Sequence, residues 1–151
     1  MSNLEKLNLI EVILDTIDKE KPFLGICLGL QLLFEESEED KGIAGLGVLK
    51  GQVKLIRTAL KVPHIGWNQL SIRRWAPLFE GLADGSFFYF VHSYHIAPEE
   101  EEIVSATCDY GYEFPVAVWR DNLLAVQFHP EKSQRAGLKI LENFGRLVKG
   151  C

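Results

Sequence analysis

The sequence has little that would mark a secreted, membrane or nucleic-acid-binding protein. It contains three cysteines in 151 residues, an odd number that makes no disulfide framework, so we expect a reducing, cytoplasmic location. No apolar run approaches the ~20 residues that span a bilayer, and residues 1–6 lack the features of a signal peptide. Acidic residues outnumber basic ones by 21 to 16, which argues against a nucleic-acid-binding surface. We therefore expect neither a membrane nor a nucleic acid as a partner.

Apolar residues are plentiful enough for a buried core. The composition is 47% hydrophobic and 25% charged, which excludes a disordered chain. We find no repeat, linker or shift in composition that would separate two domains. The expectation is one domain over residues 1–151.

The hydrophobic pattern of the first third predicts helix, strand and helix in that order. Apolar residues at helical spacing over residues 7–17 predict a helix that begins with a capping box from Ser2 to Glu5. A short apolar strand follows at residues 23–27, and a second helical pattern covers residues 28–36. This order is typical of a parallel sheet covered by helices.

The rest of the chain is rich in β-branched and aromatic residues. The candidate strands cover residues 53–56, 70–72, 87–94, 103–108, 116–119 and 123–128, and an amphipathic helix covers residues 133–148. Asp121 and Asn122 predict a hairpin between the last two strands. We therefore expect an α/β fold with a mixed, largely parallel sheet flanked by helices.

The segment from Gly25 to Gly29 has the pattern of a nucleophile elbow, with Cys27 between strand and helix. In such a turn the flanking glycines allow close backbone approach, and the helix N-terminus favours the thiolate. The N–H of Leu28 would then donate to a developing oxyanion. A structural cysteine buried at a strand end explains this pentapeptide equally well.

A base and its orienting partner are available in the segment from His129 to Ser133. His129 follows the predicted strand 123–128, and Pro130 ends that strand so that Glu131 can fold back toward the imidazole. Alone, this segment would be a His-Pro turn with a surface glutamate. Together with Cys27 it indicates a cysteine nucleophile with its base and orienter.

The remaining histidines and cysteines show no ligand pattern. His92 and His95 would point to opposite faces of a strand, and His64 is isolated in sequence. With no glycine-rich phosphate loop either, we expect no metal and no cofactor. Cys108 is predicted to be a packed strand residue, and Cys151 a frayed terminal thiol.

Four segments together resemble a known family. Residues 22–34 (PFLGICLGLQLLF) and 127–133 (QFHPEKS) resemble the nucleophile and His/Glu segments of the class I, or triad, glutamine amidotransferases. Residues 63–68 (PHIGWN) and 89–94 (YFVHSY) are similar to the glutaminase subunits of imidazole glycerol phosphate synthases within that family. The resemblance covers essentially the whole chain and implies a flavodoxin-like core.

The resemblance also implies roles for individual residues. Cys27 would be the nucleophile, His129 the general base and acid, and Glu131 its orienter. The substrate L-glutamine would be held by Gln31 and by the backbone around His92, Ser93 and Tyr94.

In the imidazole glycerol phosphate synthases that this chain resembles, ammonia released from a thioester intermediate passes to a (β/α)₈-barrel cyclase in histidine biosynthesis. The residues at or near the docking face would be Pro63, Trp67, Asn68, Tyr89 and Lys132. An exposed Trp67 would suit an interface anchor, although a core tryptophan is an equal alternative.

Members of the family begin with additional βα units, including a Pro-Gly-rich loop that gives a second oxyanion donor. No segment of this sequence matches that loop. We therefore expect an N-terminally incomplete domain with weak or absent glutaminase activity on its own. Two alternatives stay open: the glutaminase domain of another synthase, such as an anthranilate synthase, and a catalytically impaired module that only binds a partner.

Overall fold

The structure is a computed structural model that describes residues 1–39 and 42–150. The helices are α1 (Ser2–Lys6), α2 (Leu9–Asp18), α3 (Leu28–Gln31) and α4 (Gln134–Lys149), with short 3₁₀ helices η1 (Pro77–Phe79), η2 (Glu101–Ile103) and η3 (Pro130–Lys132). The strands are β1 (Phe23–Ile26), β2 (Phe34–Ser37), β3 (Leu49–Leu55), β4 (His64–Gln69), β5 (Ser71–Ile72), β6 (Phe87–His92), β7 (Tyr94–Pro98), β8 (Val104–Asp109), β9 (Glu113–Arg120) and β10 (Leu123–Val126).

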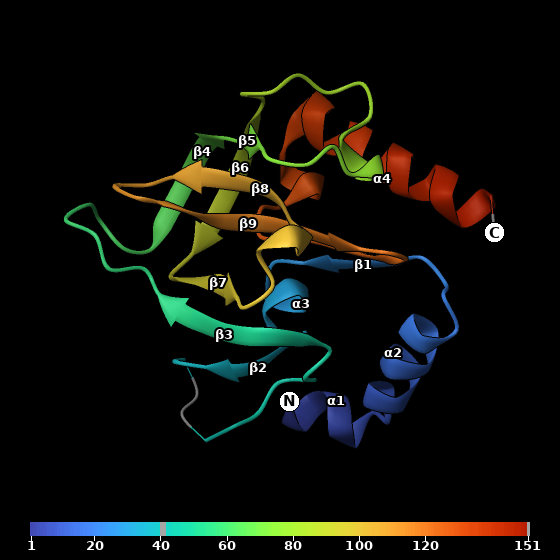
Figure 1. Cartoon of the computed structure of the whole chain (residues 1–151). Coiled ribbons are helices and arrows are strands. Elements are labelled where there is room, and N and C mark those ends of the chain that lie inside the picture. The colour runs from blue at the N-terminus through green and yellow to red at the C-terminus, as the bar shows by residue number, and fades with distance from the viewer. Residues whose placement is uncertain (40–41, 151) are drawn as a thin grey trace.

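The largest sheet has the strand order β1-β10-β9-β8-β5 (Figure 1). β1 and β10 run parallel, so their carboxyl ends meet at the same edge of the sheet. β9 and β10 form the predicted hairpin, in which Leu123 pairs with Arg120 across a turn with Asp121 in the left-handed region. The predicted mixed sheet is confirmed, but parallel pairing does not dominate. Among the described strands only β1–β10 and β2–β3 pair in parallel.

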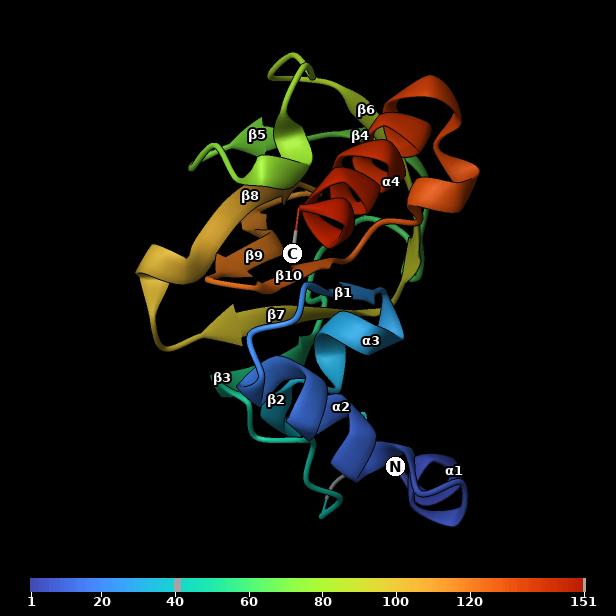
Figure 2. The same cartoon turned by 90° about the vertical axis from the view of Figure 1, so that its right-hand side faces the viewer.

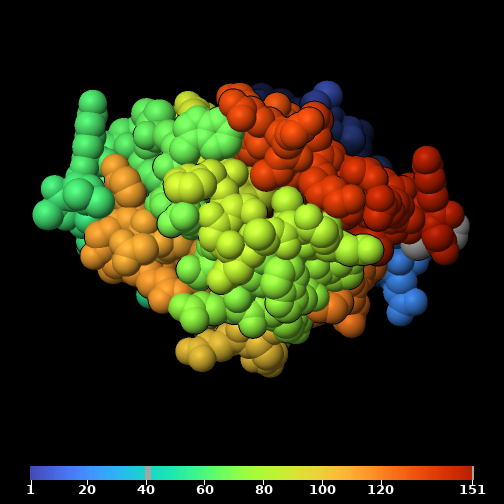
Figure 3. All heavy atoms as spheres, turned by 90° about the horizontal axis from the view of Figure 1, so that it is seen from above, coloured from blue at the N-terminus to red at the C-terminus, as the bar shows by residue number. Residues whose placement is uncertain are grey.

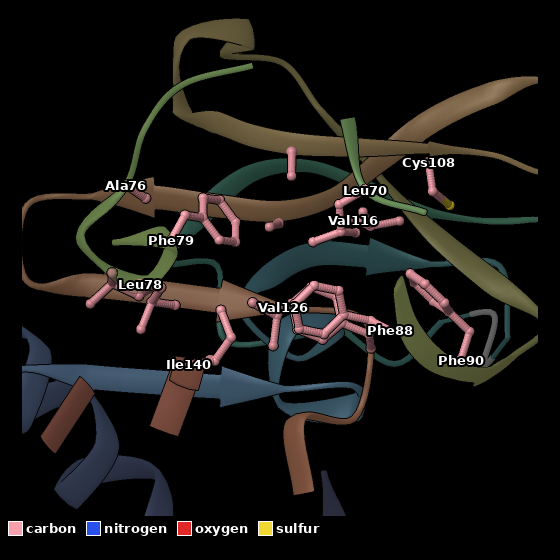
Figure 4. Close-up of a cluster of buried hydrophobic side chains, with 14 of the residues drawn as sticks. Leu70, Ala76, Leu78, Phe79, Phe88, Phe90, Cys108, Val116, Val126 and Ile140 are labelled. Carbon is pink, nitrogen blue, oxygen red and sulfur yellow. The ribbon is translucent and has the colours of Figure 1, made fainter. Parts of the chain in front are cut away.

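β10 lies between two hydrophobic cores. Leu124 and Val126 contact the core that includes Ile140 of α4, whereas Leu123 and Ala125 contact the core that includes Leu30 of α3. Figure 2 shows α4 and α3 on opposite sides of this sheet, and Figure 4 shows the α4-side core. Because both faces of β10 are covered, its residues read as a continuous apolar run rather than an alternating one.

Two smaller sheets complete the fold. β2, β3 and β7 form one, and β4 pairs antiparallel with β6 in the other. Seen from above, the green to yellow segment that contains β4, β5 and β6 lies beside the red α4 (Figure 3). The register of β4 and β6 places His64 opposite His92 and Trp67 opposite Tyr89.

The first helix differs from the sequence-based expectation. It is broken into α1 and α2, because Asn8 adopts a left-handed conformation with φ 54°. Asparagine tolerates that conformation better than most residues. The predicted capping box is absent from α1, which has Met1 as its N-cap and no side-chain cap.

The predicted helix over residues 28–36 is wrong beyond Gln31. Phe34 begins β2, where it pairs with Leu49 and is fully buried. In so short an apolar run the spacing suits a helix or a strand, and burial against β3 decides between them. Within the described residues, no helix is long and apolar enough to cross a membrane.

Candidate active site

Cys27 occupies the sharp turn between β1 and α3. Its backbone has φ 51° and ψ −106°, a conformation that non-glycine residues rarely adopt and that is typical of a nucleophile elbow. The turn is tied to the sheet by the Cys27 N–H, which donates to the carbonyl of Val126 at 2.8 Å. A Cβ on Gly25 would lie 3.0 Å from the Ala125 Cβ, so this glycine permits the close approach that we predicted, whereas a Cβ on Gly29 would meet nothing within 4 Å.

The thiol of Cys27 is partly shielded from solvent. This burial raises the pKa of Cys27 above its ordinary value, while hydrogen bonds from the Leu28 N–H and the Gln127 side chain lower it. Burial is the largest of these effects. Burial therefore outweighs the thiolate bias that we expected at this turn.

His129 and Glu131 form a close pair on the neighbouring strand end. The Nδ1 atom of His129 lies 2.6 Å from Oε1 of Glu131, which confirms the predicted fold-back after Pro130. The backbone N–H of His129 donates to the Tyr89 carbonyl, and Ser133 Oγ donates to the His129 carbonyl. The backbone that carries the imidazole is thereby held from both sides.

The Cys27 turn and the His129 segment lie at the same edge of the sheet. β1 and β10 are in register with Ile26 opposite Val126, so Cys27 and Gln127 follow side by side. The charges of Glu131 and Lys132 reach Cys27: Glu131 raises its pKa and Lys132 lowers it. The topology thus gathers all three predicted triad residues around one strand edge.

A pocket of about 310 Å³ opens beside Cys27. It is lined by the predicted glutamine-binding residues together with several neighbours: Cys27, Leu28, Gln31, Glu39, Pro63, Val91, His92, Ser93 and Tyr94. Gln31 is anchored by its Nε2 atom, which donates to the Tyr94 carbonyl at 3.2 Å and to Gln127 Oε1 at 3.0 Å.

Gln127 belongs to the site, although no sequence pattern singled it out. Its side chain is fully buried and contacts Cys27 and Gln31. Its place two residues before His129 could have identified it from the sequence, since alternate residues of an extended segment share a face.

His64, isolated in sequence, has a close partner in the fold. Its Nδ1 atom lies 3.0 Å from His92 Nε2, in a buried pair between β4 and β6. The two residues are distant in sequence and meet only through strand pairing. His95 has a different neighbour, the hydroxyl of Tyr112 at 3.0 Å, so His92 and His95 do not share a partner.

The predicted interface residues of β4 and β6 lie together. Trp67 is 46% exposed and contacts Tyr89 edge-to-face, with 6.1 Å between the ring centroids. Asn68 lies 3.4 Å from His64 Nε2 and donates to the Asp109 carbonyl. Trp67 is thus a surface residue, and the alternative of a core tryptophan is wrong.

The remaining predicted interface residues lie nearby, Pro63 at the pocket and Lys132 in η3.

Cys108 is a packed residue of β8, as predicted, and burial raises its pKa to about 12. Cys151 lies outside the described residues. In the part of the chain that the structure describes, no three His, Cys, Asp or Glu residues are placed to hold a metal ion.

The chain is similar to several known proteins. The chain is 57% identical over 146 residues to imidazole glycerol phosphate synthase subunit HisH of Aquifex aeolicus, a match that covers 97% of this chain and 70% of that protein. It is 54% identical over 148 residues to the same subunit of Methanocaldococcus jannaschii, covering 98% and 74%.

Among solved structures, a protein described as a glutamine amidotransferase has the same fold, with a TM-score of 0.68 at 23% identity over 94% of this chain and 71% of that one. A second glutamine amidotransferase, from Thermotoga maritima, has a TM-score of 0.62 at 21% identity, covering 97% and 58%. Residues 4–147 match the family profile described as glutamine amidotransferase class-I. The chain therefore belongs to the class-I glutamine amidotransferase family.

Proposed function

We propose that the chain is the glutaminase subunit of an imidazole glycerol phosphate synthase and acts as one amidotransferase domain. The observation that carries the proposal is Cys27 in a strained strand-to-helix turn, with the His129–Glu131 pair at the adjacent strand end. The HisH relatives, which are more than half identical to this chain, support the choice of synthase.

The first half of the reaction forms a thioester. Cys27 Sγ attacks the side-chain amide carbon of L-glutamine, and His129 takes the thiol proton. Glu131 holds the imidazole in one tautomer and stabilises its protonated form. The N–H of Leu28 donates to the oxyanion of the tetrahedral intermediate. Collapse of this intermediate breaks the C–N bond, and His129 returns the proton so that ammonia leaves.

The second half releases glutamate. His129 removes a proton from water, whose oxygen attacks the thioester carbon. The C–S bond then breaks to release glutamate, and the proton held by His129 passes to the sulfur and regenerates the Cys27 thiol. The free ammonia then passes to the partner. Glutamine is held in the 310 Å³ pocket by Gln31 and by the backbone of residues 92–94.

The proposed partner is a (β/α)₈-barrel cyclase subunit, which uses the ammonia to make imidazole glycerol phosphate and AICAR. Trp67 and Tyr89 would contact it, because the exposed Trp67 packs edge-to-face on the half-buried Tyr89, on the strands that adjoin the pocket. Pro63, Asn68 and Lys132 flank this pair. The reaction needs no cofactor and, as a step of histidine biosynthesis, belongs in the cytoplasm.

The test is covalent labelling by a diazoketone analogue of glutamine, read by peptide mass spectrometry with and without the cyclase. We expect stoichiometric modification of Cys27, none in a Cys27→Ser variant and none at the buried Cys108. Absence of labelling both with and without the cyclase would contradict the proposal and favour a binding module. Capture of an anthranilate synthase component instead of the cyclase would favour the other synthase.

A further inference from the structure

Gln127 is a fully buried primary amide that touches the candidate nucleophile. Its Nε2 atom donates to Cys27 Sγ at 3.5 Å, and its Oε1 atom accepts from Gln31 Nε2 at 3.0 Å. A buried amide must satisfy both its oxygen and its NH₂ group. Gln127 does so entirely inside the site, which points to a role beyond filling space.

The network determines which way the Gln127 amide points. Gln31 Nε2 donates to the Tyr94 carbonyl, and a main-chain carbonyl can only accept. The same NH₂ group faces Gln127, so Gln127 must present its oxygen there, because two NH₂ groups cannot bond each other. The Gln127 N–H is then left to point at the Cys27 sulfur.

This direction matters for the chemistry of a buried thiol. Burial disfavours the thiolate of Cys27. A neutral N–H donor stabilises the thiolate more than the thiol, because hydrogen bonds to a charged acceptor are the stronger ones. It does so without placing a further charge near Glu131.

We propose that Gln127 is a positioning residue that donates to the Cys27 sulfur and couples it to Gln31. Gln31, which would hold glutamine, thereby also orients the Gln127 N–H toward the sulfur of Cys27. The inference deepens the proposed glutaminase function and rests on it for turnover, but the effect on the thiol stands without substrate.

The test measures alkylation of Cys27 by iodoacetamide as a function of pH, with peptide mass spectrometry to separate Cys27 from the other cysteines. Gln127→Glu keeps an oxygen for Gln31 but removes the N–H from sulfur. Gln127→Met removes the donor without adding a charge. For both variants we expect the alkylation midpoint to move up by about one pH unit, so that the rate at pH 7 falls about tenfold.

Asn143→Asp is the matched control, since Asn143 is a buried amide of α4 that bonds the Leu78 and Glu80 carbonyls. It should lower thermal stability and leave the alkylation midpoint unchanged. Should neither Gln127 variant fold, Gln31→Met removes the anchor of the Gln127 oxygen and should move the midpoint in the same direction by less.

Wild-type alkylation profiles in folded Gln127 variants would overturn the inference. The proposed function is judged separately, by glutamine turnover of the wild-type chain with its partner. A shifted midpoint without wild-type turnover would support the role of Gln127 and contradict the glutaminase. Turnover with an unshifted midpoint would support the glutaminase and contradict the role of Gln127.

Discussion

His64 and His92 form a directed hydrogen bond across β4 and β6, with 3.0 Å between His64 Nδ1 and His92 Nε2. The direction follows from the next contact, because His92 Nδ1 donates to the Tyr94 carbonyl at 2.8 Å. His92 Nε2 is therefore the acceptor, and His64 donates to it. The pair links the β4 strand to the backbone that lines the pocket beside Cys27.

This pair should make folding stability depend on pH. Burial lowers the pKa of each of these histidines from 6.5 to about 4. Between these values the unfolded chain binds protons that the folded chain does not, so stability is present above pH 6.5 and is lost as the pH falls toward 4. We expect the free energy of unfolding in urea to fall by about 1–3 kcal/mol between pH 7 and pH 5.

A variant in which both residues are replaced, His64→Asn with His92→Asn, is the control for that measurement. Its starting stability will be lower, but its loss between pH 7 and pH 5 should be smaller, with a remainder from His95, whose pKa burial also lowers. If the double variant lost as much unfolding free energy between pH 7 and pH 5 as the wild type, the pair would not be the source of the pH dependence.

Glu131→Gln should impair turnover with little effect on stability. The variant loses the charge that stabilises protonated His129, so we expect kcat of the complex with the cyclase to fall about 10²-fold. Glu131 is about half exposed, and the free energy of unfolding should change by less than about 1 kcal/mol. Glu142→Gln, which removes a surface partner of Arg146, should leave kcat unchanged. Equal kcat values for the two variants would argue against the orienting role.

Gly137→Ala should displace the segment that carries His129. A Cβ at Gly137 would lie 1.9 Å from the Pro130 carbonyl oxygen, so η3 has to move. We expect a loss of about 1–3 kcal/mol in the free energy of unfolding together with lower glutaminase activity. Gly145 lies in the same helix, and a Cβ there would meet nothing within 4 Å. Gly145→Ala should therefore stabilise α4 by about 1 kcal/mol. Thermal melts of both variants distinguish crowding from helix propensity.

Trp67→Ala should weaken binding to the cyclase without unfolding the chain. Trp67 is 46% exposed, and an aromatic anchor at an interface centre typically contributes about 2 kcal/mol or more, so Kd should rise at least about tenfold in calorimetry. Trp75→Ala removes a tryptophan that is 59% exposed in the segment between β5 and η1, and should leave Kd unchanged. Similar losses of cyclase affinity in the two variants would show that β4 is not the docking strand.

Local patterns predicted much of this molecule. The hairpin at Asp121 and the amphipathic helix α4 follow from turn chemistry and helical spacing, which act over a few residues. The fold-back of Glu131 onto His129 follows in the same way, since the two are separated only by Pro130. Residues 34–37 were missed as a strand, because their partner β3 lies beyond a loop and short apolar runs suit either element.

The sequence by itself determined the candidate chemistry: a cysteine at a strand-to-helix turn, and a histidine with a carboxylate two residues away. Only the tertiary structure decided what surrounds them. The parallel pairing of β1 with β10 brings Gln127 to the Cys27 sulfur, and the pairing of β4 with β6 brings His64 to His92. These contacts join residues 100 and 28 positions apart, and no local propensity encodes such distances. They arise because strand register and burial place particular side chains together once the core has formed.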